Sequence, residues 1–257
     1  MSHLQKPLFF ILCFFVFSLN LKAETVYSLG AKDIVLGALA LGLYGISYSM
    51  DYPERPDEIV LDINDVNAFD RRLMFPLDSN KNEISEGIVH ALLVLPVITV
   101  FGNFNMKTLV TYGIMYSEAF FLTFGTRVWL KKSITRNRPY MYDYEIWYKP
   151  TFYEFNSFPS GSTAMAFLGA TFLTTTLSQE YPEAVWKWPF IFGSYSLAAW
   201  AGAIRLRSGH HYLTDVLAGA AIGSFYGWAV PFLHKNRKNK NPRIDITGNG
   251  LSVSLKL

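Results

Sequence analysis

The chain of 257 residues is poor in cysteine and in charge, and each shortage excludes a class of protein. Its single cysteine, Cys13, lies inside the apolar run PLFFILCFFVFSLNL, which excludes a disulfide framework and a cysteine metal site. Charged residues make up only 17% of the sequence, and the formal net charge is +3. The basic residues do not line one face with interleaved aromatic side chains, which argues against a nucleic-acid partner.

Hydrophobic residues, in contrast, make up 51% of the chain and aromatic residues 16%, a composition typical of membrane proteins. Residues 1–23 combine a basic start, an apolar stretch and the sequence LKA, which favours a cleaved signal peptide over a retained leader helix. Six later segments approach the length that crosses a membrane: 33–50, 87–104, 109–130, 162–179, 188–206 and 212–233. We therefore expect an all-α, polytopic membrane helix bundle of about six spans, with 33–50 and 87–104 as its weakest spans.

The same pattern divides the chain into four regions. After the leader, residues 24–86 contain the first span and a loop with ten acidic side chains, in which VNAFDRR favours a short surface helix. Residues 87–234 form the membrane core, where the small residues of AAWAGA and LAGAAIGS favour close helix packing. Residues 235–257 begin with basic residues and then alternate around Gly-Asn-Gly, which predicts a β-hairpin.

Ionisable residues at the ends of spans are costly in a membrane and therefore indicate function. In RVWLKKSITRNRP, Lys131 follows a span and Arg138 lies in the next loop, although flanking charge alone also explains this cluster. In RLRSGHHYLTD, His211 and Asp215 are four residues apart and share a face if the last helix begins near His210. The carboxylate can then orient one ring nitrogen and leave the other free, as a base or nucleophile requires.

The third cluster is FPSGST, residues 158–163, where a turn with several hydroxyls leads into an apolar helix. These hydroxyls are typical helix caps. The loops 131–161 and 205–211 each join two successive spans and open on the same side of the membrane. One site can therefore combine Lys131, Arg138, Ser160, Arg205, His211 and Asp215. Such cations and hydroxyls, together with the N–H groups of a helix N-terminus, bind a multiply charged tetrahedral anion, which indicates phosphate.

In their order and spacing, these residues resemble the type 2 phosphatidic acid phosphatase superfamily, whose phosphate pocket is shared with vanadium-dependent haloperoxidases. Three motifs carry the resemblance over residues 87–233: K-x6-R-P, PSGS in place of Pro-Ser-Gly-His, and R-x5-H-x3-D. The resemblance implies that His211 attacks phosphorus to form a phosphohistidine and that Asp215 fixes its tautomer. It also implies a phosphate pocket that uses no metal or other cofactor, made of Lys131, Arg138, Ser160, Gly161 and Arg205.

The sequence departs from the family at two positions. Ile204 replaces the serine that usually precedes the arginine of the third motif, a minor change because Arg205 itself is present. The larger departure is Ser162, because the histidine at this position serves the family as general acid. Three explanations stay open: a leaving group that needs little protonation, a substitute donor such as His210 or Ser162 itself, or a pocket without turnover. The expected function is a membrane lipid-phosphate phosphatase acting on a phospholipid phosphate, a polyprenyl diphosphate or a lipid A phosphate. Its alternatives are a non-catalytic phospholipid-binding relative and a lipid phosphotransferase.

No protein partner is predicted. The expected location is a bacterial inner membrane, since the basic start of the tail is typical of a cytoplasmic segment. A cytoplasmic tail would turn the site toward the periplasm or the outside. This orientation conflicts with six spans after a cleaved signal, because such a chain would begin and end outside.

Overall fold

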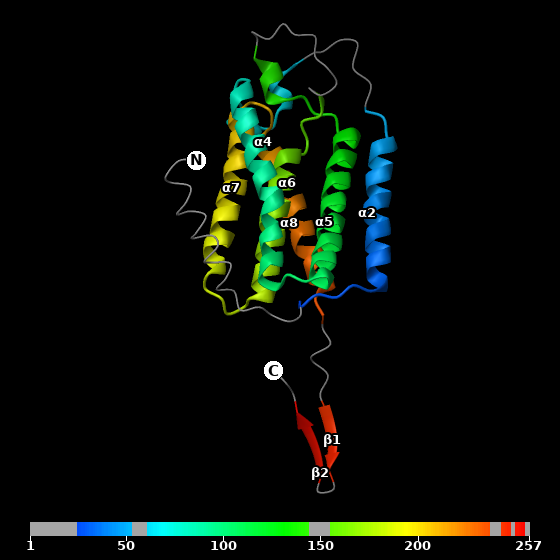
Figure 1. The fold of residues 1–257 in the computed structure, drawn as a ribbon. Coiled ribbons are helices and arrows are strands. Elements are labelled where there is room, and N and C mark those ends of the chain that lie inside the picture. Colours follow the sequence, from blue (N-terminus) through cyan, green and yellow to red (C-terminus); the bar gives the residue numbers. More distant parts are fainter. Residues whose placement is uncertain (1–24, 53–60, 144–154, 237–242, 248–249, 255–257) are drawn as a thin grey trace.

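The structure is a computed structural model that describes residues 25–52, 61–143, 155–236, 243–247 and 250–254. The predicted leader, residues 1–23, lies outside the described residues. The remaining chain forms a bundle of long helices (Figure 1): α2 (Ala31–Ser49), α4 (Ser79–Val94), α5 (Met106–Ser133), α6 (Gly161–Glu180), α7 (Lys187–Arg207) and α8 (Leu213–His234). Shorter elements connect them: η1 (Ile63–Asp65), α3 (Ala68–Arg71), η2 (Leu95–Asn103) and η3 (Pro139–Tyr142).

The six apolar segments all form helices in the predicted order, which confirms the all-α fold class. Among the described residues, three helices are long and apolar enough to cross a membrane, by length and composition: Ala31–Ser49, Ser79–Val100 and Leu213–His234. The first two of them contain most of the segments predicted to be the weakest spans, so that ranking was wrong. The number of six spans stays a prediction.

Helix α4 begins well before the predicted position 87. Asp78 caps it by accepting a hydrogen bond from the backbone N–H of Lys81 at 3.0 Å, which satisfies an amide of the first turn. The chain then continues as the 3₁₀ segment η2 from Leu95, where Pro96 provides no N–H for an α-helical hydrogen bond. The earlier start matters because it places residue 86 on a helix.

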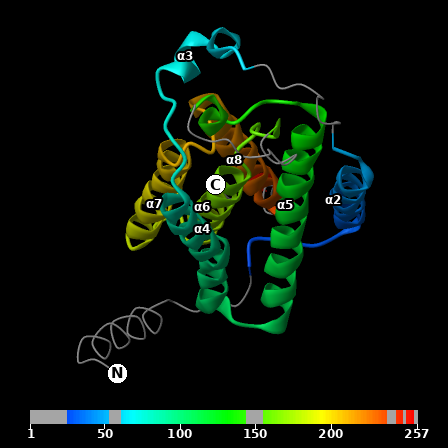
Figure 2. The ribbon, with the colours of Figure 1, turned by 90° about the horizontal axis from the view of Figure 1, so that it is seen from above.

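Helix α6 lies at the centre of the bundle, surrounded by α4, α5, α7 and α8, whereas α2 packs on the outside against α5 (Figure 2). Most residues of α6 are buried, and the others are half-buried. Large apolar side chains are exposed on the outer helices, among them Ile34, Leu39, Phe192, Trp200, Leu217 and Trp228. An exposed apolar surface of this kind is suited to lipid, where helices satisfy their own backbone hydrogen bonds.

Helices α6 and α8 approach each other closely at two glycines. A Cβ atom on Gly219 would lie 2.4 Å from the carbonyl oxygen of Ser160, and one on Gly223 would lie 2.0 Å from that of Ala164. Only glycine fits at such contacts, which confirms the close packing predicted from LAGAAIGS. The contact also sets the first turn of α8 beside the first turn of α6.

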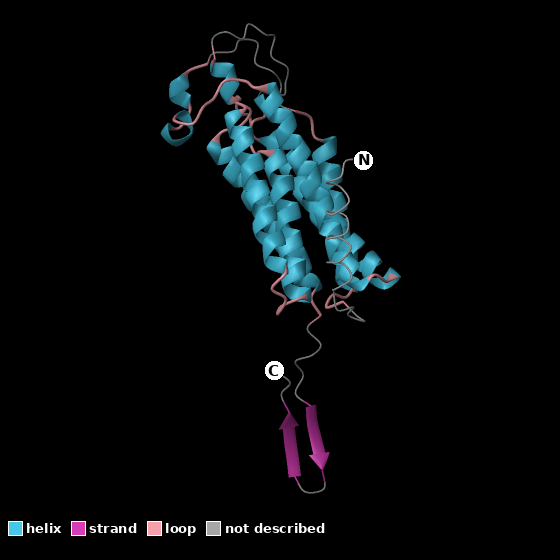
Figure 3. Cartoon of the chain, turned by 60° about the vertical axis from the view of Figure 1, so that its left-hand side comes forward, coloured by secondary structure: helices cyan, strands magenta, loops and turns pink. Residues whose placement is uncertain are grey.

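The predicted hairpin is present. Strands β1 (Arg243–Thr247) and β2 (Gly250–Ser254) pair antiparallel, with Arg243 opposite Ser254 and Thr247 opposite Gly250. The regular structure that is described elsewhere in the chain is helical (Figure 3).

The segments before α2 and after α8 are paired with each other. The N–H of Ser28 donates to the carbonyl of His234 at 3.1 Å, and the N–H of Asn236 donates to that of Val26 at 2.8 Å. Both segments therefore lie at the same end of the bundle, opposite the first turn of α8.

Candidate active site

The three sequence clusters meet at one end of the bundle. The N–H of Ser160 donates to the carbonyl of Asp215 at 3.0 Å, which joins the PSGS turn to α8. The Arg138 side chain donates to the carbonyl of His210 at 2.8 Å, and the Lys131 ammonium donates to that of Asn156, also at 2.8 Å. The basic loop, the hydroxyl turn and the histidine loop are thus held together by direct hydrogen bonds.

His211 is buried beside Asp215, as predicted, although α8 begins at Leu213 rather than near His210 and His211 therefore precedes the helix. Its Nδ1 lies 3.5 Å from Oδ2 of Asp215, which is slightly beyond the usual range of a hydrogen bond. Burial, followed by the positive charges of Arg138, Arg205 and Lys131, lowers the pKa of His211 well below its usual value. The ring is therefore neutral at neutral pH, which is the form that can attack an electrophile.

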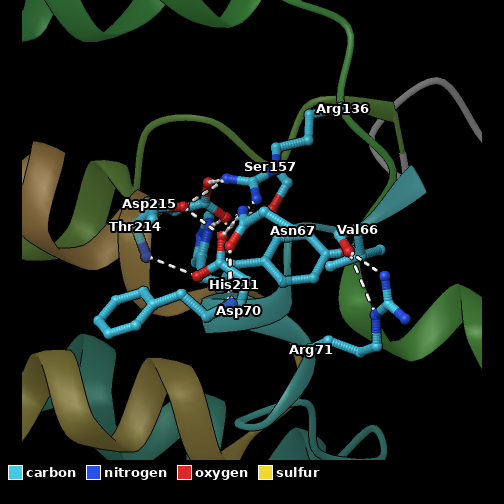
Figure 4. Close-up of polar contacts among 11 residues, drawn as sticks. Val66, Asn67, Asp70, Arg71, Arg136, Ser157, His211, Thr214 and Asp215 are labelled. Carbon is cyan, nitrogen blue, oxygen red and sulfur yellow. Dashed lines mark hydrogen bonds and ion pairs between the residues drawn. The ribbon is translucent and has the colours of Figure 1, made fainter. Parts of the chain in front are cut away.

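Asp215 is oriented by side chains that the sequence had not singled out (Figure 4). Arg136 donates through Nη1 to Oδ1 of Asp215 at 2.5 Å and through Nη2 to Oδ2 of Asp70 at 2.6 Å. Ser157 donates its hydroxyl to Oδ2 of Asp215 at 2.5 Å, and the N–H of Tyr212 donates to the same oxygen at 2.9 Å. The Asp215 carboxylate is thus fixed from three directions.

Asp70 brings the acidic loop into the site. The short helix predicted at VNAFDRR exists as α3, but its Asp70 is completely buried, so the surface helix was only half right. Oδ1 of Asp70 accepts from the N–H of Thr214 at 2.9 Å, which caps the start of α8 from a distant segment. Burial opposes its ionisation, but hydrogen bonds from Thr214, Arg136 and Asn67 outweigh burial and hold the pKa of Asp70 below its usual value.

Helix α6 begins at the predicted turn, with Ser160 as its N-cap residue. The Ser160 side chain makes no capping hydrogen bond, because its hydroxyl pairs with that of Thr163 at 2.8 Å. The expected capping by this hydroxyl was therefore wrong. A Cβ on Gly161 would lie 2.3 Å from Nη1 of Arg127, so this turn is faced by an arginine that the sequence-based site left out.

A sequence profile of the PAP2 superfamily matches residues 111–239, the part of the chain that holds all three motifs. The chain belongs to the PAP2 superfamily. Lipid A 1-phosphatase of Porphyromonas gingivalis is 38% identical over 72 residues, or 28% of this chain and 15% of that protein. Probable diacylglycerol pyrophosphate phosphatase 1 of Schizosaccharomyces pombe is 30% identical over 84 residues, or 31% of this chain and 29% of that protein.

The chain thus spans less than a third of the length of either curated relative. A solved structure, that of the transmembrane PAP2 type phosphatidylglycerolphosphate phosphatase from Bacillus subtilis, has 18% sequence identity and a TM-score of 0.45. That match covers 79% of this chain and 96% of the other.

Within the PAP2 motifs, Ser162 is the unusual residue, and it contacts a carboxylate. Its hydroxyl donates to Oε1 of Glu86 at 2.6 Å, and Nη1 of Arg205 donates to the same oxygen at 3.1 Å. Glu86 comes from the second turn of α4, and its side chain is 40% exposed. A carboxyl group therefore lies next to the position where PAP2 proteins usually have histidine, and it remains accessible from outside.

His210, the substitute donor considered from the sequence, is poorly suited to that role. Its Nδ1 donates to the carbonyl of Ser208 at 3.0 Å, a contact that requires the ring proton on Nδ1. Burial and then the charges of Arg205 and Arg138 lower the pKa of His210 to about 4. At neutral pH the ring is neutral, and its single N–H proton is engaged with the backbone.

Proposed function

We propose that this PAP2 protein is a membrane lipid-phosphate phosphatase that works through a phosphohistidine on His211. The observation that carries the proposal is a buried, neutral imidazole with a carboxylate behind it and cations around it. The names of both curated relatives, a lipid A 1-phosphatase and a diacylglycerol pyrophosphate phosphatase, support a phosphorylated lipid as substrate. Phospholipid phosphates, polyprenyl diphosphates and lipid A phosphates all fit this class.

In the proposed first step, Lys131, Arg138 and Arg205 neutralise the non-bridging oxygens of the phosphate. The N–H groups at the start of α6, from Gly161 onward, bind the same group, as a helix N-terminus does for anions. Nε2 of His211 then attacks phosphorus, and the bond to the leaving oxygen breaks. Positioned cations match the charge on the transferring phosphoryl group, so this scheme requires no metal.

Asp215 is proposed to stabilise the positive charge that His211 gains when it is phosphorylated. Arg136 and Ser157 keep the Asp215 carboxylate in place, since both donate short hydrogen bonds to it. In the second step, water attacks the phosphohistidine, the P–N bond breaks, and inorganic phosphate leaves.

We assign the proton for the leaving oxygen to Glu86. Before phosphate binds, Glu86 forms an ion pair with Arg205 and accepts a hydrogen bond from Ser162, so it is a carboxylate. Bound phosphate takes over Arg205 and places negative charge next to Glu86, which favours uptake of a proton from solvent and hence the protonated carboxyl form. Glu86 then gives its proton to the leaving oxygen and becomes a carboxylate. In the second step the carboxylate takes a proton from the attacking water, which restores the starting state. Ser162 serves to hold Glu86 through its hydroxyl.

The test of the nucleophile is phosphate release from detergent-solubilised lipid phosphates by wild type and His211→Ala. We expect the substitution to abolish release, together with the acid-labile, alkali-stable phosphoenzyme that a phosphohistidine would give. His210→Ala is the matched control: it removes the neighbouring ring, leaves the backbone carbonyl that Arg138 binds, and should retain turnover. Release that survives in His211→Ala would refute the mechanism.

The alternatives have distinct outcomes in the same assay. A protein that binds vanadate but shows no turnover over a broad panel of lipid phosphates would be a phospholipid-binding relative. Phosphate that appears on a second lipid instead of in solution would identify a lipid phosphotransferase.

We further propose that the protein lies in a bacterial inner membrane with its site facing outward. The basic tail that follows Lys235 supports this orientation, because such segments favour the cytoplasmic side. The pairing of residues 26–28 with 234–236 would then put Tyr27 on the cytoplasmic side too. This arrangement favours a leader that is kept as a membrane helix over one that is cleaved as a signal peptide.

Labelling with a membrane-impermeant maleimide tests the orientation after Cys13 has been replaced by serine. Arg72→Cys, near α3 at the site end, should react from outside in intact cells. Val185→Cys, in the loop between α6 and α7 at the other end, is 78% exposed and should react only after permeabilisation. The opposite pattern would reverse the orientation.

A further inference from the structure

A second group of ionisable side chains lies far from His211. It consists of Asp33 in the first turn of α2, Glu118 on α5 and His234 at the end of α8. One nitrogen or oxygen atom from each of the three lies within 4.8 Å of the others. His211 precedes the start of α8 and His234 is its last residue, so the length of the helix, about 33 Å at 1.5 Å per residue, separates this group from the phosphate site.

The ring of His234 is oriented so that Nε2 points at the two carboxylates. Its Nδ1 donates to the carbonyl of Val230 at 2.8 Å, which fixes the proton on Nδ1. Nε2 contacts Oδ1 of Asp33 and lies 3.3 Å from Oε2 of Glu118. Histidines that bind metals show this arrangement, with one nitrogen on a backbone carbonyl and the other directed at the ion.

The buried carboxyl group of Glu118 lacks hydrogen-bond partners. Glu118 is only 4% exposed, and neither of its carboxylate oxygens has a hydrogen-bond partner among the described residues. Two carboxyl groups face one imidazole, so with both of them ionised the group keeps a net negative charge even when the ring is protonated. Buried charge of this kind is costly unless it is paired or binds a metal.

Neighbouring lysines and arginines do not supply the missing charge. In the described part of the chain, none of them forms an ion pair with Asp33 or Glu118. Lys32 is adjacent in sequence to Asp33, but its ammonium donates to the carbonyl of Leu233 at 2.8 Å. A bound cation would supply the positive charge that balances the group.

We propose that Asp33, Glu118 and His234 bind one divalent transition-metal ion of the Zn²⁺ type. One imidazole nitrogen and two carboxylate oxygens are common zinc ligands, whereas Mg²⁺ and Ca²⁺ prefer oxygen alone. The ion joins α2 to α5 and α8 at the end of the bundle where residues 26–28 pair with 234–236. Its role is structural, because the phosphate chemistry takes place at the other end.

The test uses the full chain, purified in detergent, stripped with a chelator and titrated with Zn²⁺. We expect one Zn²⁺ per chain by elemental analysis and a melting temperature that rises by several degrees on reloading. Co²⁺ should give visible absorption bands on binding. His234→Ala and Glu118→Gln should lower the affinity by more than the roughly 10- to 100-fold that loss of an outer-shell partner costs.

Matched variants separate the metal from a simple ion pair. His90→Ala removes an exposed histidine and should bind Zn²⁺ as wild type does. If His234 only pairs with the carboxylates, Glu118→Gln removes an unbalanced charge, and the melting temperature should stay or rise whether or not Zn²⁺ is present. If His234→Ala fails to fold, Glu118→Gln still tests metal binding, because the amide nearly preserves the shape of the side chain.

Wild type that binds no Zn²⁺ or Co²⁺, or that binds them as well as Glu118→Gln does, would overturn the proposal. Phosphate release from lipid phosphates should be similar in wild type and folded Glu118→Gln at low temperature. A failure of the metal site is thus distinguishable from a failure of the proposed phosphatase.

Discussion

Glu86→Gln is the substitution that most directly tests how this protein works without the usual histidine. The amide keeps the size of the carboxyl group and can still accept hydrogen bonds from Ser162 and Arg205. The amide cannot act as a general acid. If Glu86 donates the proton, the loss of rate must therefore depend on how strongly the leaving group requires protonation.

The expected size of the effect follows from the leaving group. General acid catalysis is worth about 10²- to 10⁴-fold, and a lipid monophosphate that leaves as an alkoxide needs all of it. A lipid diphosphate releases a phosphate that is stable as an anion and needs little protonation. We expect kcat for the monophosphate to fall by about 10²- to 10⁴-fold and kcat for the diphosphate by less than about tenfold.

The assay measures phosphate release from a lipid monophosphate and a lipid diphosphate that carry the same tail. The ratio of their two rates removes effects common to both substrates, such as a small shift of Arg205. Glu83→Gln, an exposed glutamate on the same helix, is the control and should leave both rates unchanged. In the Glu86→Gln protein, adding Ser162→His should restore part of the monophosphate rate. Equal losses on both substrates, or no loss, would refute the role of Glu86.

Three further predictions concern the framework of the site. Gly223→Ala should lower the melting temperature, at a cost of about 1–3 kcal/mol, because its Cβ would meet the carbonyl of Ala164, whereas Gly193→Ala, with nothing within 4 Å, should not. Asp70→Asn should destabilise the protein at neutral pH. Because the pKa of Asp70 is below its unfolded value, the difference from wild type in thermal unfolding should shrink below about pH 4, and a constant difference would contradict this reasoning. The lowered pKa of His211 predicts that phosphoenzyme formation, measured as a burst of product, has no acid limb near pH 6.5; a limb there would contradict a neutral ring.

The parts of the site that the sequence predicted are those coded by local spacing. His211 and Asp215 are only four residues apart, so they lie together even though His211 precedes α8 and Asp215 lies in its first turn. The apolar segments likewise predicted the order of the helices, because hydrophobic periodicity is a local property. The association of the two site loops followed from topology alone, since loops that join successive spans alternate between the two sides of a membrane.

The residues that were missed are joined across long distances in the sequence. Arg136 bonds to Asp70 and Asp215, and neither pairing leaves a local pattern. Glu86 was counted among the charges of a polar loop because the helix was expected to begin at 87. The signal that could have corrected this was Asp78, a typical N-cap residue. A cap at this position starts α4 at residue 79 instead of 87, which includes Glu86 in the helix.

The polar segment before α4 is therefore part of the site. Gly209 has a φ of 73°, and a Cβ there would lie 2.5 Å from the carbonyl oxygen of Phe75, so the histidine loop crosses this segment where only glycine fits. The N–H of Asp78 also donates to the carbonyl of Ser208 at 3.1 Å. Asp70 holds Arg136, and through it Asp215, while Glu86 lies beside Ser162. Because the same segment fixes the carboxylate behind His211 and sets the start of α4, a change in its length would disturb the nucleophile and the proton donor together.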